Sequence, residues 1–428
     1  MSKNKKIIRI GVIVVYFILV FFHVALLLLG RSWVFSSLLF YSVLAIVSVW
    51  LIKLIFFGKK SKTSSVTKLK TIKYSIYITF LILAISDLGL RYITPKYRSY
   101  SERNNSIFYI SPFSNGFRNL MTYIVYGTNT SKNGVYPANT SITYKTADFE
   151  YTHSFNEFGL RERKNIKSLA EGKKVILAIG DSFTEGVGTH QDSTWQRFLE
   201  QKLKKAGYGN YIVINAGISD TDPVSQLKIY ETLQKEFNPE ITVISIGSND
   251  MLDIILKGGP EKLETRKDYL KAQPFQYYLF SWCYIFRAFS FVVYDNPEIF
   301  MNQQKFYGEI IKAEEIICTQ IDKIKEKQIS HNGKTIVFFF PDQNESLELH
   351  YKFKVFEQMI DKLKLQNDIY VFDMLDYDRS SQKTSKDIIT SYYWTTDGHM
   401  KVSGYKLWAE VLFDKLINSK CLEENENK

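Results

Sequence analysis

The chain has 428 residues, enough for two or three domains, and its composition is ordinary apart from an aromatic content of 15%. Its net charge of +11 arises near the start, because residues 1–100 carry 15 lysines and arginines and one acid, whereas residues 101–428 carry a net charge of −3. This distribution excludes nucleic acid as a partner. Cys283, Cys318 and Cys421 are scattered and form neither a zinc motif nor a disulfide framework. The sequence leaves open whether two of them form one disulfide bond.

Three long apolar segments open the chain, at residues 7–29, 33–57 and 74–92. A helix needs about 20 apolar residues to cross a bilayer, so we expect three transmembrane helices within a membrane region of residues 1–93. Lysines gather before the first segment and between the second and third, and such residues favour the cytoplasmic side. The sequence therefore predicts a multi-pass integral membrane protein with a cytoplasmic N-terminus and an extracytoplasmic C-terminal domain.

Residues 94–150 are rich in Tyr, Ser, Asn and Thr and predict an irregular or β-rich connecting region. In the domain expected at residues 151–428, short apolar segments alternate with segments of helical spacing. Such alternation is typical of a parallel sheet covered by helices on both faces. The expected strands are residues 175–179, 211–215, 241–246, 335–340 and 369–372, and the expected helices are residues 194–205, 225–236, 301–327, 352–365 and 403–416. The fold class is therefore α/β, a three-layer α/β/α arrangement around a five-stranded, mostly parallel sheet.

One segment, residues 275–294, does not fit this alternation because it is almost wholly apolar and aromatic. It contains Arg287 near its middle, and a charged side chain is costly in lipid. We therefore favour a buried helix or a lid over the substrate pocket, with a membrane-dipping helix as the alternative.

Four short blocks stand at strand ends or before the last helix. The first ends in Ser182, and a serine hydroxyl becomes a nucleophile when a base takes its proton. The second and third contain Gly217 and Asn249, whose N–H groups could bind an oxyanion. The fourth pairs Asp397 with His399, a carboxylate and a base. Alone, the first block also fits a helix cap or a phosphate loop, and the next two fit plain turns or caps.

Taken in this order, the blocks closely resemble the SGNH (GDSL-type) serine hydrolase superfamily, over roughly residues 150–418. The stretches that carry the resemblance are Gly180-Asp181-Ser182-Phe183-Thr184-Glu185-Gly186-Val187-Gly188, Ile214-Asn215-Ala216-Gly217, Ile246-Gly247-Ser248-Asn249-Asp250 and Asp397-Gly398-His399 with Gly404-Tyr405. An upstream segment, residues 156–161, is similar to one that precedes this domain in membrane-tethered members. The resemblance implies the flavodoxin-like SGNH fold.

The resemblance also implies a role for each site residue. Ser182 would attack an ester carbonyl, His399 would take its proton, and Asp397 would orient the imidazole. The amides of Ser182 and Gly217 and the side chain of Asn249 would hold the oxyanion. No metal and no organic cofactor are expected.

The predicted function is that of an extracytoplasmic, membrane-anchored serine esterase that removes acyl groups from glycans or lipids. An O-acyltransferase that modifies a cell-envelope polysaccharide would form the same acyl-enzyme on Ser182 and would work with a membrane acyl-transfer partner. A catalytically silent envelope scaffold would keep the fold alone. The expected partners are an acyl-ester substrate and the membrane, and nucleic acid is not among them.

Overall fold

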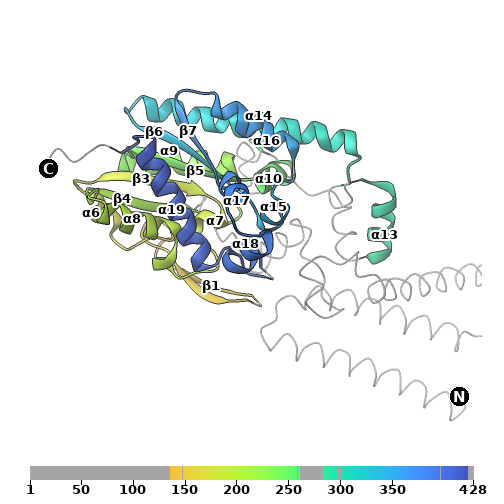
Figure 1. Ribbon diagram of the computed structural model, residues 1–428, viewed down its shortest axis with the longest axis horizontal. Coiled ribbons are helices and arrows are strands. Elements are labelled where there is room, and N and C mark those ends of the chain that lie inside the picture. Colours follow the sequence, from red (N-terminus) through yellow and green to blue (C-terminus); the bar gives the residue numbers. More distant parts are fainter. Residues whose placement is uncertain are drawn as a thin grey trace, which may run out of the picture. The chain divides into compact units, whose positions relative to one another are not determined.

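The computed structural model describes residues 135–146, 148–257, 259–260, 283–295, 300–395 and 397–422. The chain divides into two compact units. The unit formed by Val125–Lys271 and Gln304–Lys428 contains the central sheet, and Figure 1 shows it with its strands and helices labelled. The unit formed by Met1–Ile124 and Ala272–Gln303 contains one described helix, α13 (Tyr284–Val293).

Five strands form the central sheet, in the order β4-β3-β5-β6-β7, and all neighbouring pairs are parallel. The strands are β3 (Lys174–Gly180), β4 (Tyr211–Gly217), β5 (Ile241–Gly247), β6 (Lys334–Phe340) and β7 (Ile369–Asp373). Each contains one predicted apolar segment, so the prediction of a five-stranded α/β sheet is confirmed. The order is that of a doubly wound fold, with its switch point between β3 and β5, where such sheets bind ligands.

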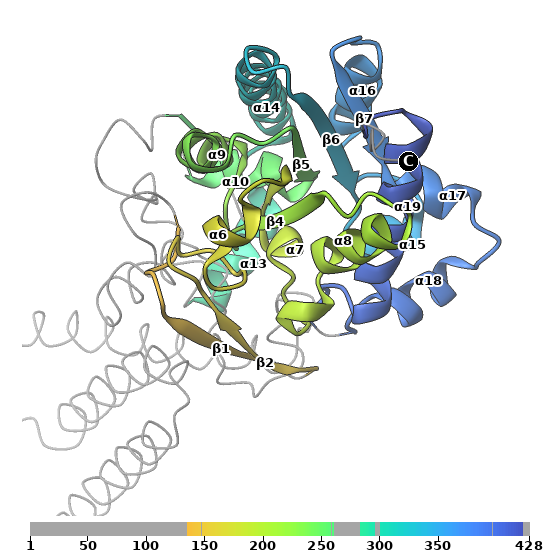
Figure 2. The same cartoon turned by 90° about the vertical axis from the view of Figure 1, so that its left-hand side faces the viewer.

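Both faces of the sheet are buried, as the alternating side chains of β3 show. Val175, Leu177 and Ile179 contribute to one hydrophobic core, and Ile176 and Ala178 to the other. The first core is covered by α9 (Pro223–Phe237), α14 (Gln303–Ile329) and α16 (Lys354–Lys364), and the second by α8 (Trp195–Lys205) and α19 (Val402–Asn418) (Figure 2). The arrangement is therefore a three-layer α/β/α sandwich.

A two-stranded antiparallel hairpin precedes the sheet. Its strands are β1 (Ser141–Lys145) and β2 (Glu150–Ser154), with Ser141 opposite Ser154. Strand β1 lies in the predicted connecting region, and β2 lies in the predicted catalytic domain apart from its first residue. The hairpin thus joins chain segments on both sides of the expected boundary at residue 150, and the domain limits themselves stay predictions.

Helix α13 occupies part of the aromatic segment for which we expected a buried helix or a lid. Arg287 and Ser290 are buried, whereas Phe289, Phe291 and Val292 are exposed. The segment is therefore helical from Tyr284 to Val293, with one covered and one open face. Its role as a lid stays a prediction.

None of the helices in the described ranges combines the length with the apolar character that a bilayer crossing needs. Helix α14 has 27 residues, but ten of them are charged, and charged side chains are costly at bilayer depth. This finding contradicts the predicted localisation as a multi-pass integral membrane protein with an extracytoplasmic catalytic domain, and that prediction is not retained. The three expected spans, at residues 7–29, 33–57 and 74–92, lie outside the described residues.

Candidate active site

The proposed nucleophile, Ser182, is the first residue of helix α7 (Ser182–Glu185), just after β3. The Asp181 carboxylate caps this helix by accepting the Phe183 N–H at 2.9 Å. Gly180 permits the close approach of strand and helix, because a Cβ there would lie 2.2 Å from Thr184 Oγ1. The sequence thus forms a tight strand-to-helix turn that places a serine at the carboxyl edge of the sheet.

His399 and Asp397 complete a hydrogen-bonded chain with Ser182. Nε2 of His399 lies 2.8 Å from Oγ of Ser182, and Nδ1 of His399 is hydrogen-bonded to Oδ1 of Asp397. With a carboxylate beside Nδ1, that nitrogen carries the ring proton and Nε2 is left as the acceptor for the serine hydroxyl. The structure therefore brings together all three residues for which the sequence predicted a catalytic role.

A tight loop places Asp397 and His399 side by side although only Gly398 separates them. Gly398 has a φ of 87°, which favours glycine. The backbone of Trp394 closes the loop, since its N–H donates to the His399 carbonyl at 2.8 Å and its carbonyl accepts from the Gly398 N–H at 3.0 Å. The Trp394 indole N–H in turn donates to the Gly188 carbonyl at 3.0 Å, which ties the loop to the segment after α7.

The electrostatics of this loop favour a base that can hold a proton. Burial disfavours the charged imidazolium, but the hydrogen bond and the charge of Asp397, helped by the charges of Asp181 and Glu185, outweigh burial and raise the pKa of His399. The ring of Phe183 packs against the imidazole, with 4.9 Å between the ring centroids. Proton transfer from Ser182 to His399 would therefore create a cation that its surroundings stabilise.

Asn249, a predicted oxyanion donor, begins helix α10 (Asn249–Lys257), and one residue separates it from the end of β5. Its side-chain Nδ2 donates to Oδ2 of Asp181 at 3.0 Å. Asp181 immediately precedes Ser182, so this hydrogen bond holds the amide beside the nucleophile. A side-chain NH₂ group has two donors, and one hydrogen bond to Asp181 leaves the second for another acceptor.

Gly217, the other predicted oxyanion donor, has a different arrangement. Its N–H donates to Oδ1 of Asn215 at 3.0 Å. A Cβ at this position would lie 2.2 Å from the Glu185 nitrogen, so the glycine allows β4 to pack directly against α7. In the described structure Gly217 is therefore a close-packing residue with an occupied amide, and it would have to change hydrogen-bond partner to bind an oxyanion.

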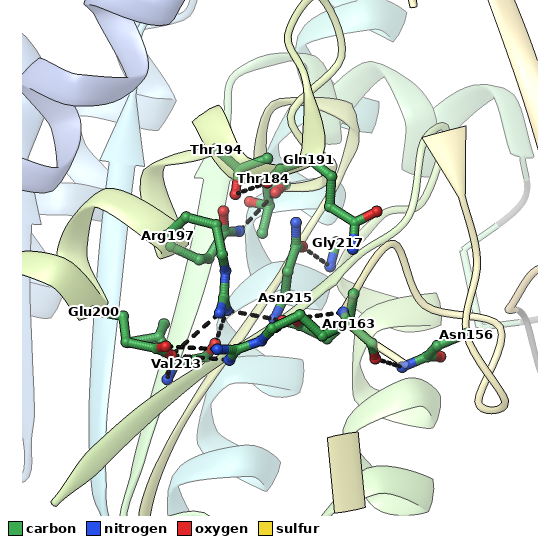
Figure 3. A network of polar contacts seen from close by, with 12 residues as sticks. Asn156, Arg163, Thr184, Gln191, Thr194, Arg197, Glu200, Val213, Asn215 and Gly217 are labelled. Atoms are coloured by element: carbon green, nitrogen blue, oxygen red, sulfur yellow. Dashed lines mark hydrogen bonds and ion pairs between the residues drawn. The ribbon is translucent and has the colours of Figure 1, made fainter. Parts of the chain in front are cut away.

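Side chains satisfy the backbone of β4, which is an edge strand of the sheet (Figure 3). Glu200 accepts the Val213 N–H at 2.8 Å, and Arg197 donates to the Val213 carbonyl. Glu162 accepts the Asn215 N–H at 2.9 Å. The outer edge of β4 is thus bonded to three charged side chains, which fix the strand that carries Asn215.

These charged groups also bind one another. Arg163 donates to both oxygens of Glu200, at 2.7 and 3.0 Å, and Arg197 donates to Glu162 at 2.9 Å (Figure 3). Asn215 extends the network toward the nucleophile, because its Nδ2 donates to the Glu185 carbonyl at 3.2 Å. The network therefore connects the sheet edge with helix α7.

Sequence reasoning missed the group of side chains that surrounds Glu185. Its buried carboxylate binds Nδ1 of His153 at 2.6 Å, the Tyr136 hydroxyl at 3.0 Å, and both the backbone N–H and the hydroxyl of Ser219, at 2.7 and 2.6 Å. Burial disfavours its charge, but the hydrogen bonds from His153 and Ser219 and the charges of His153 and Arg161 outweigh burial and lower the pKa of Glu185. One signal was available in the sequence, since Phe149, Tyr151, His153 and Phe155 alternate as on one face of a strand.

Neither a metal cluster nor a disulfide accompanies these residues. Across the described ranges, no group of three or more His, Cys, Asp and Glu side chains could hold a metal ion. All three cysteines lie in the described part of the chain, and none is joined to another.

Comparison with known proteins relates this site to one family. A family model described as GDSL-like Lipase/Acylhydrolase matches residues 178–407, more than half of the chain. The chain is similar to Esterase TesA of Pseudomonas aeruginosa, with 33% identity over 79 residues, which make up 18% of this chain. The matched part spans only 39% of that esterase's length.

Two solved structures are also similar. A crystal structure of TesA has 16% identity and a TM-score of 0.35, covering 57% of this chain and 98% of that one. The lipase/acylhydrolase from Enterococcus faecalis has 15% identity and a TM-score of 0.35, covering 59% and 99%. The residues of this chain that match the family model include Ser182, Asn249 and His399. The chain therefore belongs to the GDSL-like lipase/acylhydrolase family, and its class is that of a serine hydrolase.

Proposed function

We propose that this protein is a serine esterase that cleaves acyl esters through a covalent acyl-enzyme on Ser182. The observation that carries the proposal is the hydrogen-bonded chain from Ser182 Oγ through His399 to Asp397, with 2.8 Å between the hydroxyl and Nε2. A nucleophile within hydrogen-bond reach of a base, itself oriented by a carboxylate, is the arrangement that nucleophilic catalysis needs. The name of the curated relative, an esterase, supports the ester bond as the target.

Acylation begins when Oγ of Ser182 bonds to the ester carbonyl carbon and its proton passes to Nε2 of His399. The carbonyl oxygen becomes an oxyanion, for which the Ser182 N–H and the second donor of the Asn249 side chain are the proposed partners. When the tetrahedral intermediate collapses, the bond to the leaving oxygen breaks and His399 returns its proton to that oxygen. The products of this half-reaction are an alcohol and acyl-Ser182.

Deacylation repeats these steps with water as the nucleophile. Water gives a proton to Nε2 of His399 as its oxygen bonds to the acyl carbon. Collapse then breaks the bond to Ser182 Oγ, and the proton on His399 returns to the serine. The raised pKa of His399 favours the imidazolium that forms in both halves, and Asp397 holds the ring in the required tautomer.

A fluorophosphonate probe tests the nucleophile directly, because it forms a covalent bond only with an activated serine. We expect wild type to gain the probe mass on the peptide that contains Ser182 and Ser182→Ala to gain none. Ester hydrolysis should fall by roughly 10⁵- to 10⁶-fold in that variant, as for other triad serines. Ser168→Ala is the matched control, since Ser168 is an exposed serine on α6 (Ile166–Ala170). Labelling that persists in Ser182→Ala would show that another residue is the nucleophile.

The proposed substrates are acyl esters of glycans or lipids, and a product assay separates hydrolysis from transfer. Acetylated oligosaccharides and short-chain glycerides are offered in parallel, each with and without a free sugar acceptor. We expect free acid as the product in every case, at a rate that the acceptor does not change. Formation of an acylated sugar in place of free acid would show that the protein is an O-acyltransferase with the same acyl-enzyme on Ser182.

A further inference from the structure

Residues 136–154, which include the β1–β2 hairpin, precede the residues matched by the family model but contact both halves of the candidate site. One half is the loop that carries Asp397 and His399. The other half is helix α7, which begins with Ser182. One part of this segment contacts the first half, and another part contacts the second half.

The turn of the hairpin contacts the Asp397–His399 loop. Oδ2 of Asp148 accepts the backbone N–H of Asp397 at 2.8 Å. The ring of Phe149 lies 5.6 Å from that of Trp394, whose backbone closes the same loop. Asp148 is itself fixed, because the Thr146 hydroxyl oxygen accepts its N–H at 3.1 Å. Asp148 and Phe149 therefore support the loop that carries Asp397.

The far end of β2 and the residues before β1 contact helix α7. His153 and Tyr136 bind the two oxygens of the Glu185 carboxylate, at 2.6 and 3.0 Å. Glu185 ends the single turn of helix that Ser182 begins. All three side chains are buried, so these hydrogen bonds are shielded from competition with water.

We propose that Asp148, His153 and Tyr136, which all lie in residues 136–154, are positioning residues that set the separation between His399 and Ser182. The proposal rests on the serine esterase function proposed above. The 2.8 Å bond from His399 to Ser182 joins residues that are 217 positions apart in the chain, so their separation depends on how the two segments are held. Asp148 holds the segment of the base, and His153 with Tyr136 holds the segment of the nucleophile. A misplacement of about 1 Å in a reacting group can lower turnover by about 10²-fold.

Asp148 offers the sharper test because its hydrogen bond to this loop goes to the backbone N–H of Asp397. We expect Asp148→Ala to lower kcat by roughly 10- to 100-fold with little change in KM. Asp148→Asn keeps an oxygen acceptor and should restore most of the lost kcat. The downfield NMR signal of the His399 Nδ1 proton should shift in Asp148→Ala and return toward its wild-type position in Asp148→Asn.

The matched control is Thr143→Ala, which removes an exposed cross-strand hydrogen bond to Thr152 in the same hairpin. We expect this variant to keep the wild-type kcat and the wild-type NMR signal. If Asp148→Ala does not fold, Asp148→Leu replaces it as a variant that keeps the branching at Cγ but has no acceptor. Thermal unfolding of each variant identifies a loss caused by unfolding alone.

The positioning role is overturned if Asp148→Ala has wild-type kcat and NMR signal, or if Thr143→Ala shows an equal loss. Failure of the proposed function gives a different result, in which the wild-type protein neither hydrolyses esters nor is labelled at Ser182. The two proposals can therefore fail separately.

Discussion

Two carboxylate–histidine pairs lie near helix α7. In both, a carboxylate binds Nδ1 of the imidazole, but the surroundings of the two pairs differ. In one, His399 bonds through Nδ1 to Asp397, and in the other, His153 bonds through Nδ1 to Glu185. The side chains of the first pair are 22% and 18% exposed, whereas those of the second pair are both 0% exposed. Each histidine thus has a carboxylate that fixes its tautomer, and exposure distinguishes them.

The two Nε2 atoms also have different partners. Nε2 of His399 meets the Ser182 hydroxyl, whereas Nε2 of His153 is buried without a hydrogen-bond partner among the described residues. Burial lowers the pKa of His153 despite its bond to Glu185, whereas burial is outweighed at His399, where Asp397 raises the pKa. The comparison therefore favours His399 over His153 as the proposed base, because His399 has both a hydroxyl partner at Nε2 and surroundings that stabilise its imidazolium.

The largest difference between the pairs should appear in turnover. His399→Gln removes the proposed base, and kcat for ester hydrolysis should fall by roughly 10⁵- to 10⁶-fold. His153→Gln should lower kcat by no more than about 10-fold, because a glutamine NH₂ can still donate to Glu185. Steady-state kinetics on the same ester measure both. Equal losses in the two variants would contradict the assignment of distinct roles to the two histidines.

Asp397→Asn sharpens the comparison through the pH dependence of kcat/KM. His399 acts as a base only when neutral, so wild-type kcat/KM should rise with pH to a midpoint above about 6.5, the ordinary histidine pKa. Removing the Asp397 charge removes the cause of the raised pKa, so the midpoint should move to lower pH. The maximal rate should also fall, by about 10⁴-fold, because an asparagine no longer fixes the tautomer as a carboxylate does. A midpoint that stays in place would show that Asp397 does not set the pKa of His399.

The smallest expected effect is on stability and belongs to the buried pair. The folded pKa of His153 lies below its unfolded value, so the unfolded chain binds the proton more readily. The stabilisation that neutral His153 contributes to the folded state is therefore full above about pH 6.5. It declines as the pH falls toward the lowered pKa of the folded state. His153→Gln should flatten the fall of the thermal midpoint over this window, measured by circular dichroism.

His331 provides the control for that measurement, because its side chain is exposed in the turn that follows α14. His331→Gln should leave the slope of the thermal midpoint against pH as in wild type. A His153→Gln variant whose slope equals that of wild type would mean that the buried imidazole does not contribute to the acid sensitivity of the fold.

The pattern of apolar segments was enough to predict the sheet, because each central strand is buried on both faces and is therefore a continuous apolar run. The run at residues 241–246, for example, became β5 (Ile241–Gly247). Ser182, His399 and Asp397 were also predictable, since each lies in a short motif whose neighbours determine its place. Gly398 is one such neighbour, because its left-handed backbone allows the tight spacing of the acid and the base.

Contacts between distant loops were not predictable in the same way. Asp148 meets Asp397 across 249 positions of the chain, and nothing in either local sequence indicates the other. The hydrogen bond of Gly217 to Asn215 was missed for a different reason, because a glycine after a strand fits both an exposed donor and a close-packing residue. Only the packing of α7 against β4 shows which of these two roles Gly217 has.

The charged side chains along β4 have a further consequence for how this molecule meets others. An edge strand with unsatisfied N–H and C=O groups is a template on which another chain can add a strand, and this is a common start of aggregation. In β4 the groups of Val213 and the N–H of Asn215 are already bonded to Glu200, Arg197 and Glu162. A strand from another molecule would first have to displace these buried or half-buried ion pairs. This edge of the sheet therefore resists the addition of another strand.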